Sequence, residues 1–175
     1  MASTGHRIDR DHPILAAVSV IGAELGAVEH APAWSLSDDE TRRALEELTR
    51  LEARVSALQL KVAAQADRNQ VGDVSGATSA GVWWANQTRM TQGEAHRKVK
   101  LAKALERHEQ VGEALAAGDV LVDQARVITD ALDALPEDID PDIRVQARDH
   151  LLDAAAHFDA KALRLHGRRI LDVVA

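Results

Sequence analysis

The run from Ser37 to Val71 contains neither glycine nor proline, and this uninterrupted stretch constrains the fold more than any other feature. Ser37 with Glu40 three residues later forms a capping box, which is typical of a helix start. Apolar residues then alternate at spacings of four and three, at Ala44, Leu48, Leu51, Val55, Leu58 and Val62. This heptad seam predicts one helix of about 30 residues, roughly 45 Å long. Its partner helix would come from the same bundle or from a second copy of the chain.

The rest of the chain also favours helices. Aromatic residues make up only 2% of the sequence, and the apolar content is mostly alanine, leucine and valine, which leaves too few aromatic and β-branched runs to build a sheet. Caps, glycines and prolines predict further helices at about 13–28, 80–87, 91–108, 111–117, 122–135, 141–157 and 160–174. We therefore predict an all-α, multi-helix bundle with one long helix and a helix-turn-helix-like pair. Residues 1–35 would form an N-terminal arm and a short helix, and residues 36–175 the all-helical domain.

The sequence carries little sign of chemistry. It has no cysteine, which excludes disulfides, thiolate catalysis and thiolate zinc sites. The eight histidines show no ligand spacing, and no glycine-rich phosphate loop or activated serine is recognisable. We expect no catalytic residue, no metal and no cofactor. No apolar run reaches the ~18 residues that span a bilayer, and no signal peptide is recognisable, so we expect a cytoplasmic chain without a membrane segment.

Residues 76–107 give the strongest indication of a partner. They predict two short helices joined by an abrupt turn, with Trp83 and Trp84 in the first helix. The segment 89–107 holds six basic residues against Glu94 and Glu106, although the whole chain has a net charge of −7. We call these six residues the cationic ridge: Arg89, Arg97, Lys98, Lys100, Lys103 and Arg107.

A cationic helix that follows a tight turn is typical of a helix-turn-helix that binds double-stranded DNA. A duplex carries one negative charge per ~1.7 Å, so a ridge of this length could meet several phosphates. The hypothesis requires that the ridge faces outward and is not neutralised by acidic residues of the fold. The alternative is a structural or dimerisation module, a homodimer through the long helix, that has no contact with nucleic acid.

Four stretches of the chain, taken together, resemble the all-helical domain of unknown function 222: L-E-A-R-V-S-A-L-Q-L-K-V-A-A-Q-A-D at 51–67, G-A-T-S-A-G-V-W-W-A-N-Q-T-R-M-T-Q-G-E-A-H-R-K-V-K-L-A-K-A-L at 76–105, A-L-A-A-G-D-V-L-V-D-Q-A-R-V-I at 114–128, and R-V-Q-A-R-D-H-L-L-D-A-A-A-H-F-D-A-K-A-L-R-L-H-G-R-R-I-L-D at 144–172. The resemblance implies a domain that precedes an HNH endonuclease domain and that binds or positions DNA. The His-Asn-His motif and cysteine pairs of such nucleases do not occur here, so we expect the nuclease domain to be absent from this chain and to follow it in a longer protein. Leu121 stands where the family usually has a small polar cap, which leaves the helix start at Val122 open.

Overall fold

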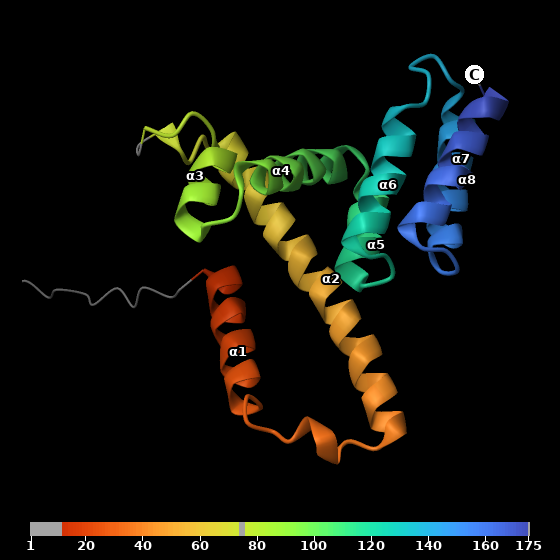
Figure 1. The fold of residues 1–175 in the computed structure, drawn as a ribbon. Coiled ribbons are helices and arrows are strands. Elements are labelled where there is room, and N and C mark those ends of the chain that lie inside the picture. The colour runs from red at the N-terminus through yellow and green to blue at the C-terminus, as the bar shows by residue number, and fades with distance from the viewer. Residues whose placement is uncertain (1–11, 74–75, 175) are drawn as a thin grey trace, which may run out of the picture. The chain divides into compact units, whose positions relative to one another are not determined.

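Figure 1 shows the computed structural model, which describes residues 12–73 and 76–174. Within those ranges the chain forms eight α-helices and one short 3-10 helix, and none of it is strand. The predicted all-α class is confirmed. The chain divides into two compact units, Met1–Arg43 and Ala44–Ala175, and each is described by itself.

The first unit contains α1, Pro13–Ala27, the 3-10 helix Ala33–Ser35, and the first residues of the long helix α2. Asp11 and His12 precede Pro13 and could each cap a helix there. His12 caps α1, because its Nδ1 accepts a hydrogen bond from the Ile14 N–H at 3.2 Å. Asp11 lies outside the described residues. None of the side chains of α1 is buried, although the helix is apolar on nearly every side.

The long helix α2, Asp38–Arg68, is the predicted uninterrupted helix. Its capping box is present: the Ser37 N–H donates to Glu40 Oε2 at 2.8 Å, and the Glu40 N–H donates to Ser37 Oγ at 3.3 Å. The hydrogen bonds from the backbone and side chain of Ser37 lower the pKa of Glu40, because they stabilise its ionised form. The cap therefore fixes where the heptad pattern begins.

The second unit consists of the remainder of α2 and six shorter helices (Figure 1). The helices α6, α7 and α8 lie side by side, and α5 packs against α6. The helix α4 contacts α5 and α6 and also pairs with α3. Their bounds are α3 Ala80–Thr88, α4 Gln92–Arg107, α5 Glu109–Ala117, α6 Val122–Asp133, α7 Pro141–Ala155 and α8 Ala160–Val174. The prediction placed the start of α5 two residues late, because His108 ends α4 and directly precedes α5.

The core of the second unit lies where α5 to α8 meet. Its largest fully buried aliphatic side chains come from all four helices: Leu115 of α5, Ile128 and Leu132 of α6, Leu151 of α7 and Leu163 of α8. The helices α6 and α8 approach each other closely. A β-carbon placed on Gly167 of α8 would lie only 2.9 Å from the Ala131 Cβ, so glycine permits this separation.

The start of α6 depends on Gln124 and not on a capping side chain at Leu121. Gln124 Oε1 accepts a hydrogen bond from the Leu121 N–H at 2.7 Å, while its Nε2 donates to the carbonyls of Ala155 and Phe158, both at 2.8 Å. This buried amide thus caps α6 and ties it to the end of α7. It explains how the helix begins at Val122 without the small polar cap.

Gly118 ends α5 in the left-handed conformation, with φ of 81°. A β-carbon there would lie 3.1 Å from both the Cβ and the carbonyl oxygen of Arg50 in α2. Two separate constraints therefore require glycine: the backbone conformation and the approach of α5 to α2.

We expect Gly118→Ala to lower the free energy of unfolding by roughly 1–3 kcal/mol. Gly76→Ala is the matched control, because Gly76 also has a positive φ of 74° but has no atom within 4 Å of the added carbon. The control should cost only the backbone strain, about 1 kcal/mol. Denaturant unfolding of both variants measures the difference, and equal effects would show that the Arg50 contact is unimportant.

Candidate interaction surfaces

The helices α3 and α4 form the predicted helix-turn-helix-like pair. Ser79 caps α3, where its Oγ accepts from the Val82 N–H at 3.2 Å, and Thr91 caps α4, where its Oγ1 accepts from the Glu94 N–H at 3.1 Å. Between them Arg89 adopts the left-handed conformation, with φ of 60°. The abrupt turn is therefore built from one αL residue and a threonine cap.

The cationic ridge faces outward at five of its six positions. Arg89, Arg97, Lys100, Lys103 and Arg107 are exposed, and His96 lies on the same face of α4. Lys98 differs from the others because it is half-buried. Its ammonium lies 2.8 Å from Gln59 Oε1 on α2 and 5.8 Å from the centre of the Trp84 ring on α3. Lys98 therefore ties together three helices, and its charge is already engaged.

The requirement that the ridge be free of acidic partners is not met. Three of its cations form ion pairs with carboxylates of other helices: Lys100 with Asp130 at 3.6 Å, Lys103 with Asp67 at 2.6 Å, and Arg107 with Asp133 at 2.6 Å. The prediction of an unneutralised ridge is wrong at these positions. The carboxylate partners belong to α2 and α6. The prediction failed because it counted only the charges within residues 89–107.

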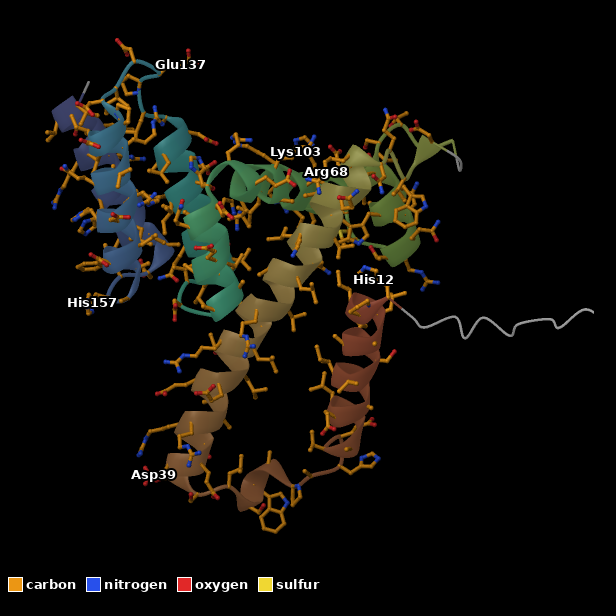
Figure 2. The ribbon with its side chains drawn as sticks, turned by 180° about the vertical axis from the view of Figure 1, so that it is seen from behind. His12, Asp39, Arg68, Lys103, Glu137 and His157 are labelled. Carbon is orange, nitrogen blue, oxygen red and sulfur yellow. The ribbon has the colours of Figure 1, made fainter. Side chains whose placement is uncertain are left out.

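Figure 2 shows Arg68 and Lys103 next to each other where the end of α2 meets α4. Arg68 pairs with Glu106 and Lys103 with Asp67, so each helix supplies one acid and one base to this crossing. Exposed pairs of this kind contribute roughly 0.2–1 kcal/mol each and are screened by salt. They hold the crossing in register, and they also reduce the positive potential of the ridge.

Asp133 accepts hydrogen bonds from two neighbours at once. Arg107 lies 2.6 Å from its Oδ2, and His108 Nε2 lies 2.7 Å from its Oδ1. Burial raises the pKa of Asp133, but the hydrogen bonds and charges of Arg107 and His108 outweigh that effect and lower the pKa below its ordinary value. The ionised carboxylate thus fastens the end of α4 to α6.

The residues that remain available on the ridge are Arg89 and Arg97. No ion pair is recorded for either of them within residues 12–73 and 76–174. An open hollow of about 620 Å³ lies between α3 and α4, with His96, Lys100 and Lys103 on one wall and Asp67 beside them. The geometry therefore brings predicted ridge residues together, but with a carboxylate among them.

The second candidate surface is the outer face of α2. The buried residues of this helix are Ala53, Leu60, Ala63 and Ala64. Ala53, Leu60 and Ala64 lie along one face, with Ala57 packed against the same core, and we call these four residues the inner stripe. The heptad seam lies elsewhere: Leu48, Val55 and Val62 are 56%, 42% and 44% exposed. Ala53 and Val62 are nine residues apart, about two and a half turns, so the two stripes occupy opposite faces.

The inner stripe was missed by the sequence analysis. Its spacings of four, three and four are as regular as those of the seam, but three of its four members are alanines, which give a weaker apolar signal than leucine and valine. These four residues nevertheless belong to the hydrophobic core or pack against it. The bundle therefore packs against the alanine face and leaves the larger aliphatic residues outside.

No group of three or more histidine or acidic residues that could hold a metal ion occurs in the described part of the chain. The structure does bring His150 of α7 to His166 of α8, with Nε2 and Nδ1 3.4 Å apart, and places the Phe158 ring 4.8 Å from His166. This pair joins two helices that the sequence spacing did not connect. A search of the described helices found none that is both long and apolar enough to cross a bilayer.

The described residues form an all-helical domain. The model of the family described as "Domain of unknown function (DUF222)" matches residues 42–175, and the chain belongs to that family. No curated protein and no solved structure matches the chain.

We expect Asp133→Asn to lower the free energy of unfolding at pH 7 by roughly 1 kcal/mol or less, because the contact is partly exposed. A carboxylate whose pKa is lowered on folding stabilises the fold above its unfolded pKa and loses that effect as the pH falls through its folded pKa. The difference between wild type and variant should therefore shrink as the pH falls below about 4. Thermal unfolding between pH 2.5 and 7 measures it, and a difference that does not change with pH would contradict the ion-pair account.

Proposed function

We propose that the chain is a helix-pairing interaction module that self-associates through the heptad seam of α2. One observation carries the proposal: Leu48, Val55 and Val62 of the seam are exposed on the face of α2 opposite to the one its own bundle buries, and the half-buried Leu51 and Leu58 lie between them. A regular stripe of leucine and valine left exposed marks an interaction site. Knobs-into-holes packing against a second helix is the arrangement that a heptad pattern specifies.

The expected strength of association follows from the side chains available. Full burial of a leucine or valine is worth about 1.5–3 kcal/mol, and these side chains are already partly covered, so each contributes roughly half of that. Two copies together supply on the order of 10 kcal/mol, against an association cost of about 4–15 kcal/mol. The module should therefore form a dimer that dissociates on dilution.

The state of the cationic ridge also favours this proposal over DNA binding. Lys100, Lys103 and Arg107 have carboxylate partners, and Lys98 contacts Gln59 and Trp84. A duplex would have to displace three acids to reach these cations. No comparable obstacle covers the seam within the second unit.

We expect Leu48→Asp combined with Val55→Asp to abolish self-association, because the change places charges in the middle of an apolar interface. Both positions are exposed, so the fold should be retained. Light scattering and sedimentation over a range of protein concentrations measure the mass. Leu165→Asp is the control, since Leu165 is 52% exposed but lies on α8, and it should leave the dimer intact.

A wild-type protein that stays monomeric at high concentration would overturn the proposal. The helix α1, whose apolar residues are exposed, is the candidate partner within the same chain. Were α1 the partner, Leu48→Asp with Val55→Asp would lower the stability of a monomer and would change no mass.

A second candidate function, contact with double-stranded DNA through α3 and α4, is favoured by the outward orientation of Arg89, Arg97, Lys100, Lys103 and Arg107. Surface ion pairs are weak enough for a phosphate to displace the carboxylate. In this role the domain would position DNA for a nuclease domain in a longer protein.

For this second function we expect weak duplex binding at low salt that falls steeply as the salt concentration rises. Arg89→Glu with Arg97→Glu should abolish it, whereas Arg168→Glu with Arg169→Glu, exposed on α8, should not. Asp67→Asn should strengthen binding by roughly twofold to tenfold, because it frees Lys103 from its partner. Gel-shift titrations test all three, and the absence of any binding at low ionic strength would eliminate this function.

A further inference from the structure

The charges that flank the heptad seam determine how a second copy would lie on it. In the heptad pattern the seam residues occupy positions a and d, with Leu48, Val55 and Val62 at a and Ala44, Leu51 and Leu58 at d. The flanking g positions are Glu47, Arg54 and Lys61, and the flanking e positions include Glu52 and Gln59. Flanking positions of this kind set partner choice and orientation in paired helices.

We infer that two copies pair their α2 helices antiparallel, with the two-fold axis passing through the seam midway between Leu51 and Val55. This inference rests on the proposed function and adds the partner and its register. In this register Leu48 faces the partner's Leu58, and Leu51 faces the partner's Val55. Ala44 faces the partner's Val62, so every seam residue meets another apolar residue.

The same register aligns opposite charges. Glu47 lies opposite the partner's Lys61, and by symmetry Lys61 lies opposite the partner's Glu47. Both side chains are exposed. Glu47 also pairs with Arg50 of its own helix at 3.3 Å, an exposed contact weak enough for the partner's Lys61 to replace. Near the axis Glu52 meets the partner's Glu52, and Arg54 meets the partner's Arg54. The antiparallel register therefore has two attractive contacts, both between Glu47 and Lys61, and two like-charge contacts.

The parallel arrangement is worse on the same criterion. It places each g position opposite the e position of the partner's next heptad. Glu47 of each copy then meets Glu52 of the other, which gives two like-charge contacts. Arg54 then meets the partner's Gln59, and Lys61 meets the partner's Ala66. Parallel pairing has two like-charge contacts and no attractive one. Since the apolar residues fit either orientation, the flanking charges select the antiparallel one.

The position of α3 and α4 supports this choice. Both follow the C-terminal end of α2, and the Lys103–Asp67 and Arg68–Glu106 pairs hold α4 there (Figure 2). Antiparallel pairing places the α3–α4 pairs of the two copies at opposite ends of the seam. Parallel pairing would bring two cationic ridges to the same end.

Two experiments on the full chain test the register. Glu47→Lys and Lys61→Glu should each raise the dimer dissociation constant by about threefold to tenfold, and the double variant should return it close to the wild-type value. Because the chain has no cysteine, single-cysteine variants report proximity without background. Leu48→Cys mixed with Leu58→Cys should form a disulfide-linked dimer under mild oxidation, while Leu48→Cys alone should not.

The outcomes separate this inference from the proposed function. A dimer in which Leu48→Cys cross-links to itself, or in which the charge reversal rescues nothing, would overturn the antiparallel register and leave the interaction module standing. A protein that never associates would overturn both. Variants that lose helical content by circular dichroism are replaced by the cysteine pair, which retains apolar side chains at the seam.

Discussion

The arrangement of the molecule depends on α2 having two apolar faces of which its own bundle buries only one. The inner stripe is mostly alanine, and alanine lets a neighbouring helix approach closely at little cost in conformational entropy. Gly118 makes the same closeness possible at the end of α5, where any β-carbon would meet Arg50. The bundle thus buries mostly small side chains of α2, and Leu48, Val55 and Val62 of the seam are left exposed.

The electrostatics of the cationic ridge follow from the same packing. Because α4 crosses the end of α2 and runs beside α6, the acids of those helices come within reach of its outward cations. Asp67 and Asp130 thus help to hold the helices together, and they compete with any bound anion for the lysines of the ridge. A ridge of this kind attracts a polyanion only to the extent that phosphate replaces carboxylate, which is a smaller gain than the formal charge of residues 89–107 implies.

The features that the sequence predicted correctly are local ones. Helix starts at Pro13, Ala80 and Ala160 depend on side chains within a few residues, and the capping box of Ser37 and Glu40 is contained in four. The pairing of Lys103 with Asp67 or of Arg107 with Asp133 joins helices far apart in the chain, and no spacing in the sequence encodes it. The choice between the two stripes of α2 was equally inaccessible, because both have heptad spacing and only tertiary packing decides which is buried. Gln124 is an intermediate case: glutamine at the third helical position signals a capping box, but its bonds to Ala155 and Phe158 depend on where α7 ends.

The two candidate surfaces make different demands on the chain, and this difference favours the seam. Binding at the ridge would require side chains already engaged in the fold to exchange partners, so the intramolecular contacts that stabilise the crossing of α2 and α4 would weaken as binding strengthened. Pairing at the seam would disturb only the exposed Arg50–Glu47 contact within α2, while Leu48, Val55 and Val62 would gain contacts and lose water. An interface that adds to the stability of the fold imposes no penalty on the bundle, whereas one that competes with it does. On this ground we propose the exposed face of α2, and not the ridge, as the surface that binds a partner.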